Sequence, residues 1–301
     1  MRFNTVLSIL FVSAAMGFYL PDASAEPLDL SQVAMDLAVP PMVAGLPAAG
    51  SRVAQTHPDY VKTDVYHALY LPTDWKPGTK HRYPVIVEFA GNGPYRNKYS
   101  DISTGKVEGS RLGFGISGGE NYIWICMPFL NHEGTANVTR WWGNKPQFNP
   151  QPTVDYCQKT LGWICEQYGG DWDRVLLTGF SRGAIACNYI GLHDDEISRM
   201  WRAMVVFSHY DGVRQWEYPF SDKASAMQRL QRLGNCPQFI CAEGHRDGQI
   251  QQTRMYMKQT GVQGDITFHT TGFRNHNDAW VLRPGKTRSE MRLWVTQKLS
   301  R

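Results

Sequence analysis

From residue 64 onward, the chain alternates short apolar runs with longer segments in which apolar residues recur at helical spacing. The runs of strand length cover residues 65–71, 83–90, 122–127, 174–178, 203–207, 238–242 and 266–269. Apolar runs of this length are typical of parallel strands buried on both faces, and parallel strands need long crossover connections. The pattern therefore predicts an α/β fold with a mostly parallel central sheet and helices on both faces.

The segments between these runs supply the helices. Expected helices cover about residues 153–168, 182–192, 222–233, 249–259 and 287–299. Long loops after the runs at 83–90 and 122–127 are interpreted as insertions. We predict one globular domain over residues 64–301, preceded by an arm, residues 26–63, that is rich in Pro, Ala and Gly and therefore extended.

The first 25 residues have the pattern of a secretory signal peptide. Arg2 precedes an apolar run over residues 6–20, and the small residues Ala23-Ser24-Ala25 form a cleavage site. An uncleaved membrane anchor is the alternative, but a run of about 15 residues is shorter than the roughly 20 that span a bilayer. We therefore expect a secreted or periplasmic protein with no stable membrane anchor.

Charge and cysteine content exclude several classes. A net charge of +4 without any run of like charges is not the basic patch of a nucleic-acid-binding protein. Six cysteines permit disulfides in an exported protein, yet Cys126 and Cys187 stand where cysteine serves as a small buried hydrophobe. The sequence has no Cys-x-x-Cys or His-x-x-x-His pair, so no metal site is predicted.

A candidate nucleophile lies in the pentapeptide Gly179-Phe180-Ser181-Arg182-Gly183, between an apolar run and an expected helix. A Gly-x-Ser-x-Gly sequence in this position forms a tight bend that exposes the serine hydroxyl. A hydroxyl is a weak nucleophile and needs a neighbouring base. Ser181 is therefore the predicted nucleophile, and no cofactor is predicted because this chemistry requires none.

Acyl transfer to a serine also needs N–H donors that stabilise the oxyanion of the tetrahedral intermediate. The backbone N–H of Arg182 is one candidate, because it follows the nucleophile at the start of a helix. The second should come from the loop Gly91-Asn92-Gly93 after the run at 83–90. We favour the N–H of Asn92, since glycines on both sides let the backbone approach a substrate closely.

The base and the acid should follow the nucleophile in the order Ser, Asp or Glu, His. His276 lies in the loop after the last apolar run and is the predicted base. Asp247 lies in the loop after the run at 238–242 and is the predicted acid, which would hold the imidazole in the correct tautomer. Glu243, in the same loop, and Asp211, after the run at 203–207, are the alternatives.

The stretch from Asp171 to Gly183, DWDRVLLTGFSRG, resembles secreted α/β-hydrolase esterases. It is similar to the polyhydroxybutyrate depolymerase and feruloyl esterase group and to the catalytic domain of prolyl oligopeptidase-type peptidases. These families commonly carry Asp-x-x-Arg-Val ahead of Gly-x-Ser-x-Gly. By order of elements the resemblance covers residues 64–299. It implies an α/β-hydrolase fold and a serine esterase in which the acid and the base follow the nucleophile in the order given above.

Two departures from those families bear on the substrate. Ala184 stands where the families often have another glycine, and the loop of His276 lacks their usual Gly-x-Gly-His form. The expected partner is a small-molecule or polymeric ester, of which a carbohydrate-linked ester is one form. A serine peptidase, an acyltransferase and a catalytically inactive binding protein are the alternatives on the same fold.

Four further residues are candidates for substrate binding. Trp141 and Trp142 lie in the insertion after the run at 122–127, where exposed indole rings could stack on a sugar or an aromatic acyl group. Packing under the loop is the alternative interpretation of this pair. His209 and Tyr210 follow the run at 203–207 and are candidates for the wall of the acyl pocket.

Overall fold

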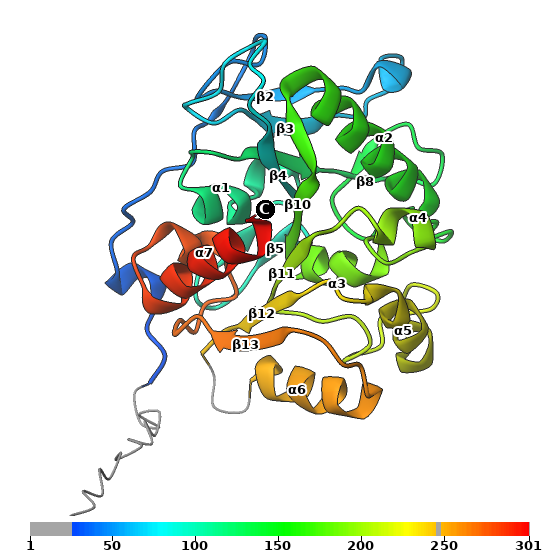
Figure 1. Cartoon of the computed structure of the whole chain (residues 1–301). Coiled ribbons are helices and arrows are strands. Elements are labelled where there is room, and N and C mark those ends of the chain that lie inside the picture. Colours follow the sequence, from blue (N-terminus) through cyan, green and yellow to red (C-terminus); the bar gives the residue numbers. More distant parts are fainter. Residues whose placement is uncertain (1–25, 245–247, 301) are drawn as a thin grey trace, which may run out of the picture.

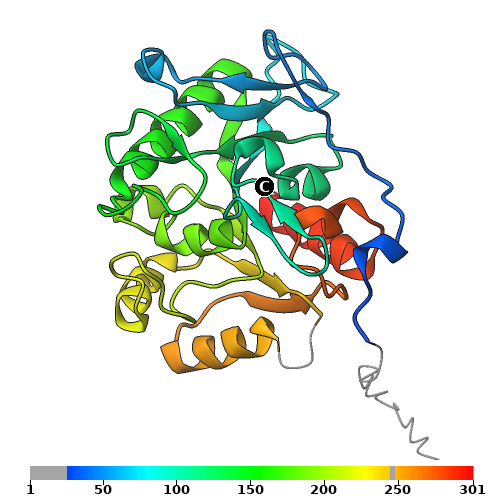
Figure 2. The same ribbon diagram turned by 180° about the vertical axis from the view of Figure 1, so that it is seen from behind.

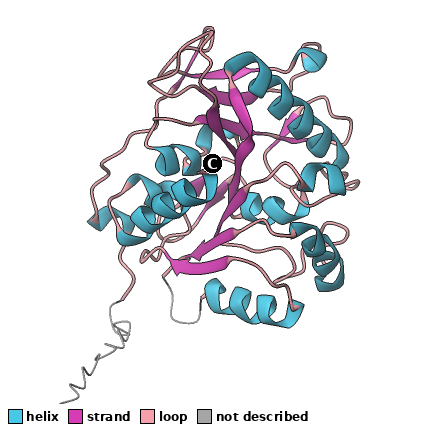
Figure 3. Cartoon of the chain, in the orientation of Figure 1, coloured by secondary structure: helices cyan, strands magenta, loops and turns pink. Residues whose placement is uncertain are grey.

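A nine-stranded sheet runs through the centre of the protein, in a computed structural model that describes residues 26–244 and 248–300. The strand order is β1-β2-β3-β7-β4-β10-β11-β12-β13, and within this sheet only β3 runs antiparallel to its neighbours (Figures 1 and 3). The expectation of a mostly parallel sheet is confirmed. The strands are β1 (Met42–Val43), β2 (Arg52–Gln55), β3 (His67–Tyr70), β4 (Tyr83–Phe89), β7 (Ile123–Met127), β10 (Gly170–Phe180), β11 (Ala203–Phe207), β12 (Gln238–Ala242) and β13 (Ile266–Thr270).

Helices cover both faces of the sheet (Figure 3). The α-helices are α1 (Leu112–Ser117), α2 (Gln151–Tyr168), α3 (Arg182–Tyr189), α4 (Asp195–Ser198), α5 (Lys223–Leu230), α6 (Gln249–Thr260) and α7 (Lys286–Leu299). Short 3-10 turns cover Leu30–Gln32, Pro58–Tyr60, Val107–Gly109, Gln231–Leu233 and Asp278–Leu282.

Alternate side chains of each central strand enter two separate hydrophobic cores. In β4, Val85 and Val87 pack in the core that contains α2 and α3, whereas Ile86 packs in the core that contains α1 and α7. Successive side chains of a strand point to opposite faces, so a run without polar residues fills both cores at once. This is why the continuous apolar runs of the sequence became the buried strands.

The segment over residues 26–63 is more ordered than its composition suggested. Strand β2 (Arg52–Gln55) pairs antiparallel with β3. Strand β1 (Met42–Val43) pairs with β2 on its other side and forms the edge of the sheet. Val53 is buried in the core, and the Arg52 guanidinium lies 4.5 Å from the centre of the Trp124 ring. These tertiary contacts order a segment whose strands of two and four residues are too short to leave a periodic pattern in the sequence.

The two expected insertions each form a small hairpin. One pairs β5 (Tyr95–Arg96) with β6 (Ile102–Ser103), and the other pairs β8 (Phe129–Leu130) with β9 (Asn137–Val138). The β5–β6 hairpin follows β4 and is visible from the side shown in Figure 2. It supplies part of the site described below.

All six cysteines are free thiols in this structure, so the disulfides that the even number permitted do not form here. Five of the six are buried, among them Cys126 in β7 and Cys187 in α3, as their positions in the sequence suggested. Burial raises the pKa of the Cys157 thiol to about 12, which keeps it protonated and unreactive at neutral pH.

The candidate signal peptide, residues 1–25, lies outside the described residues. Across the part of the chain that the structure describes, no helix combines the length and the apolar character needed to cross a membrane.

Glu88 in β4 is a buried carboxylate that caps a helix. Its two oxygens accept hydrogen bonds from the backbone N–H groups of Arg111, Leu112 and Gly113, at 2.8 to 3.2 Å, and from the Trp124 indole at 2.9 Å. Burial and the charge of Asp278 raise the pKa of this carboxyl group to about 7, and the hydrogen bonds from Gly113 and Leu112 oppose that rise. Because every named partner is a donor, the contacts favour the ionised form, in which both oxygens accept. Glu88 thereby satisfies the first amides of α1 and joins that helix to the sheet.

We expect Glu88→Gln to lower the free energy of unfolding by about 1–3 kcal/mol, because the amide NH₂ of glutamine would face an N–H donor inside the protein. Urea denaturation followed by circular dichroism measures the change. Glu120→Gln, at an exposed glutamate, is the matched control and should stay within about 0.5 kcal/mol of the wild type. Equal stability of the two variants would contradict the capping role.

Candidate active site

Ser181 occupies a strained bend between β10 and α3. Its backbone has φ 55° and ψ −113°, a conformation that non-glycine residues seldom adopt. The glycines around it are required by close approach, since a Cβ on Gly183 would lie 1.9 Å from the carbonyl oxygen of Phe89, and one on Gly179 would lie 2.2 Å from the carbonyl carbon of Gly183. The Gly-x-Ser-x-Gly pattern thus has a steric reason in this chain.

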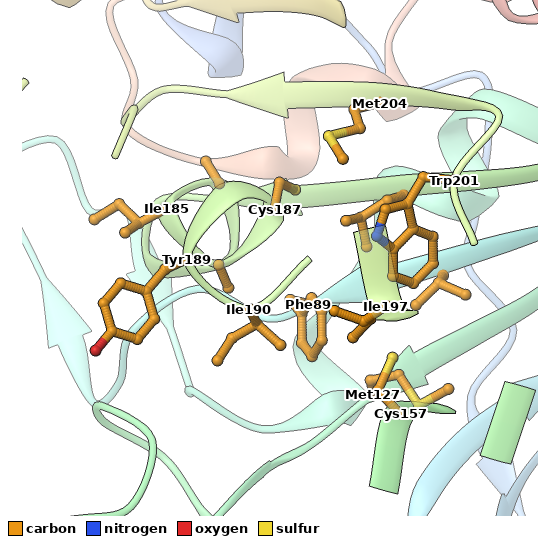
Figure 4. Close-up of a cluster of buried hydrophobic side chains, with 14 of the residues drawn as sticks. Phe89, Met127, Cys157, Ile185, Cys187, Tyr189, Ile190, Ile197, Trp201 and Met204 are labelled. Carbon is orange, nitrogen blue, oxygen red and sulfur yellow. The ribbon is translucent and has the colours of Figure 1, made fainter. Parts of the chain in front are cut away.

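Helix α3 holds this bend in place because every residue of the helix is buried. Ile185, Cys187 and Ile190 enter a hydrophobic cluster with Phe89 of β4 and Met204 of β11 (Figure 4). At the bend itself, the backbone N–H of Ser181 donates to the carbonyl oxygen of Phe207 at 3.1 Å. The position of the serine is therefore set by the core rather than by a flexible loop.

His276 lies within hydrogen-bonding distance of the serine, in the loop after β13. Its Nε2 is 3.0 Å from Ser181 Oγ, so the predicted nucleophile and base are brought together. The rings of Phe180 and Tyr95 contact the imidazole, with centroid distances of 4.8 and 5.5 Å. A base at this distance can take the hydroxyl proton as the oxygen attacks.

Glu243 is the carboxylate that contacts the imidazole. Its Oε1 is 2.6 Å from Nδ1 of His276, and its side chain is 6% exposed. Burial alone would raise the pKa of this carboxyl group, but the hydrogen bond and charge of His276 outweigh burial and hold the pKa below its ordinary value. Glu243 is therefore an ionised partner that fixes the orientation of the ring.

The two other candidates for the acid are Asp247 and Asp211. Asp247, the acid predicted from the sequence, lies outside the described residues. Asp211 forms a buried ion pair with Arg229, whose Nε donates to Asp211 Oδ2 at 2.9 Å. Of the two candidates that the structure describes, Glu243 is the one whose carboxylate contacts His276.

Asp101 is a residue of this site that the sequence analysis missed. It is buried at the end of the β5–β6 turn and accepts hydrogen bonds from the backbone N–H of His276 and from the Asn275 side chain, both at 2.9 Å. Asn97 donates to the same carboxylate at 2.8 Å. Because about 175 residues separate Asp101 from His276 along the chain, no local sequence pattern predicts this contact.

The two predicted oxyanion donors lie on segments that touch each other. Asn92 lines the cavity at Ser181, and no acceptor for the backbone N–H of Asn92 or of Arg182 is found among the described residues. The buried Arg182 side chain donates to the carbonyl oxygens of Gly91 and Gly105, at 2.9 and 3.2 Å. The Arg182 side chain therefore connects the bend at Ser181 to the loop that carries Asn92.

A cavity of about 830 Å³ opens beside Ser181. Its wall includes His209, Trp216, Tyr95 and Gln249 in addition to Ser181 and His276. The His209 ring lies between those of His276 and Trp216, with centroid distances of 5.2 and 5.6 Å. His209 is thus placed in the cavity wall, as its position in the sequence suggested.

The remaining three candidates for substrate binding lie in the core, not among the residues that line this cavity. Trp142 is fully buried against Tyr189, with stacked rings 4.5 Å apart, and Trp141 packs on Trp216. Tyr210 is buried and donates to the Gln238 side chain at 2.6 Å. For the tryptophan pair, packing beneath the loop is the interpretation that holds, because the aromatic cluster buries both indoles.

The described residues of the site offer acid–base and nucleophilic groups but no cluster suited to a metal. Within residues 26–244 and 248–300, no group of three or more His, Cys, Asp or Glu side chains has the arrangement of a metal site. A hydroxyl, an imidazole and a carboxylate in hydrogen-bonded sequence can activate the hydroxyl as a nucleophile.

Comparison with known proteins identifies the fold. No protein-family model matches the chain, and no curated protein matches it in sequence. Among solved structures, it is similar to an S-formylglutathione hydrolase from Agrobacterium tumefaciens (TM-score 0.52, 13% identity, covering 86% of this chain and 99% of that one). It is also similar to a fluorophosphonate-binding serine hydrolase of Staphylococcus aureus (TM-score 0.52, 12% identity, covering 84% and 100%).

A third similar structure is a chain described as a dipeptidyl aminopeptidase IV from Bacteroides ovatus (TM-score 0.54, 17% identity). The match covers 82% of this chain and spans only 35% of the length of that much longer protein. At these identities the similarity identifies the fold and nothing finer. The chain has the α/β-hydrolase fold, and the fold class expected from the sequence is confirmed.

We expect His209 to stay neutral over the whole range above about pH 5. Burial, followed by the charge of His276, lowers the pKa of His209 to about 4, from an ordinary value near 6.5. Between pH 6.5 and 4 the unfolded chain would bind a proton here that the folded chain does not, so this residue's contribution to stability is lost as the pH falls through that window.

An NMR titration of the histidine ring protons tests this expectation, with the His209 signal assigned by its loss in His209→Asn. We expect the chemical shift of the His209 ring protons to stay constant from pH 8 to about pH 5. A midpoint near the ordinary value of 6.5 would contradict the lowered pKa expected for this half-buried ring.

Proposed function

We propose that this α/β-hydrolase-fold protein is a serine hydrolase that cleaves carboxylic esters through an acyl-enzyme on Ser181. The observation that carries the proposal is the hydrogen-bonded series from Ser181 Oγ to His276 and from His276 to Glu243, with distances of 3.0 and 2.6 Å. The strained backbone at Ser181 supports it, because strain of this kind persists where a side chain must be presented to a substrate.

In the proposed reaction, His276 Nε2 accepts the proton of Ser181 as Oγ attacks the ester carbonyl carbon. The backbone N–H groups of Asn92 and Arg182 would stabilise the resulting oxyanion. The imidazolium then gives its proton to the oxygen of the leaving alcohol, which departs and leaves the acyl-enzyme. A water molecule, deprotonated by the same imidazole, then attacks the acyl carbon. The imidazolium returns its proton to Ser181 Oγ as the bond to the acyl carbon breaks, which releases the carboxylic acid and restores the free serine.

Glu243 is assigned the role of the acid in this proposal. Its ionised carboxylate would hold Nδ1–H of His276, so that Nε2 faces the serine as a free base, and would stabilise the imidazolium that forms. The sequence favoured Asp247 for this role, and the assignment to Glu243 rests on its 2.6 Å contact with His276.

The charges around the cavity support an uncharged ester rather than a substrate with a free amino group. Among the described residues of the wall, the charged side chains besides histidine are Glu243 and Arg274. Glu243 is bound to His276, and Arg274 forms an ion pair with Asp29 at 2.7 Å. Among the described residues, the wall therefore presents no further carboxylate that could bind an ammonium group.

Labelling with a fluorophosphonate probe tests the nucleophile. We expect the purified protein to be labelled at Ser181, because the probe phosphonylates a serine that is activated by a base. Ser181→Ala should abolish labelling, and His276→Ala should lower the rate of ester hydrolysis by roughly 10³-fold or more.

The wild-type result separates the alternatives. A wild-type protein that is not labelled, or a Ser181→Ala variant that still is, would contradict the proposal and favour the inactive binding protein. Rates on short-chain p-nitrophenyl esters, aryl esters and peptide amides then separate esterase from peptidase. Amide hydrolysis faster than ester hydrolysis would overturn the ester assignment, and transfer to an added alcohol in preference to water would favour the acyltransferase.

The identity of the acid can be tested by a matched pair of substitutions. We expect Glu243→Gln to lower kcat on the order of 10²- to 10⁴-fold with little loss of folding, because the amide cannot hold the imidazolium. Asp247→Asn should change kcat by less than about threefold. The opposite order of effects, measured on the best ester of the panel, would return the role of the acid to Asp247.

A further inference from the structure

Ser208 has an unusual backbone conformation at the edge of this site. It follows the last residue of β11 and has a φ of 86°, which a residue with a Cβ adopts only with strain. Its backbone N–H donates to the carbonyl oxygen of Cys241 in the next strand at 2.8 Å, and the residue is 4% exposed. The conformation is therefore held by the sheet, at a position where glycine would fit without strain.

The strained backbone places the Ser208 hydroxyl against the base. Its Oγ lies 3.0 Å from Nδ1 of His276 and donates to the Gln249 side chain at 3.2 Å. Glu243 Oε1 contacts the same nitrogen of His276, at 2.6 Å. One serine side chain thus contacts the base and the first residue of α6, at the ring nitrogen that Glu243 also contacts.

We propose that Ser208 is a positioning residue, whose hydroxyl fixes the orientation of the His276 imidazole together with the Glu243 carboxylate. This inference rests on the function proposed above. A hydroxyl has one donor and two acceptor positions, so it can share Nδ1–H of His276 with Glu243 while it donates its own proton to a side-chain oxygen.

The physical effect follows from where these contacts lie. Glu243 and Ser208 approach the same nitrogen of His276 from two different strands, β12 and β11. Two contacts restrict rotation of the ring where one would leave it free to swing about a single hydrogen bond. The opposite nitrogen, Nε2, then stays at Ser181, and a ring that is correctly placed before the reaction begins raises the rate of the chemical step.

A pair of substitutions separates the hydroxyl from the backbone strain. Ser208→Ala removes the hydroxyl and keeps the strain, whereas Ser208→Gly removes both, so the glycine variant should melt at the same temperature as the alanine variant or higher. We expect both to lower kcat for ester hydrolysis, and the rate of fluorophosphonate labelling, by about tenfold. KM should stay within about twofold, because the hydroxyl touches the base and not the substrate.

Asn121→Gly is the matched control. Asn121 also has a positive φ, of 62°, but lies exposed in the turn before β7. Its replacement by glycine should leave kcat unchanged, which shows that relief of backbone strain alone does not alter the rate.

Three results would overturn the inference. A Ser208→Gly variant that is folded by circular dichroism and keeps kcat within twofold of the wild type would show that the hydroxyl does no positioning. A rise in KM at unchanged kcat would assign the hydroxyl to substrate binding instead. If the wild-type protein itself is not labelled, the proposed function fails and this inference with it, whereas labelled wild type with unchanged Ser208 variants removes only the inference.

Discussion

The close packing of α3 against the ends of β4 and β10 is the constraint on which the site depends. Gly183 in the first turn of the helix touches the carbonyl oxygen of Phe89, at a distance that leaves no room for a Cβ. Every residue of α3 is buried, so the helix cannot move away to relieve the bend at Ser181. The apolar core, through this helix, holds the strained serine backbone in place.

The parallel sheet brings the remaining groups to the same edge. The central strands β4, β10, β11, β12 and β13 run parallel, so their carboxyl ends lie together. The loop with Asn92, Ser181, Ser208, Glu243 and His276 follow these five strands in that order. The carboxyl ends of β4, β10, β11 and β12 are buried, whereas β13, at the edge of the sheet, is half-buried. The buried ends are rigid, so the geometry of the site is set by the sheet as well as by the loops.

The loop of His276 is the exception, since it needs support from outside the sheet. Asp101 of the β5–β6 hairpin accepts the backbone N–H of His276, and Tyr95 of the same hairpin packs against the imidazole. The hairpin and the base are therefore one structural unit, although one precedes the nucleophile in the chain and the other follows it. A change in the hairpin would therefore alter the orientation of the His276 imidazole.

The sequence by itself determined the fold class, the strands over residues 203–207 and 238–242, and the pairing of Ser181 with His276. These features follow from local patterns: apolar runs of strand length, and glycines spaced around a serine between a strand and a helix. Only the tertiary structure decided that Glu243 contacts His276, that Trp141 and Trp142 are buried, and that Asp101 holds the base loop. The sequence favoured Asp247 over Glu243 for its place late in the loop, and the contact of Glu243 with the imidazole depends on how the chain leaves β12. A contact across about 175 residues has no local signature at all, because it is created by the packing of a hairpin against a loop and not by the pattern of either segment.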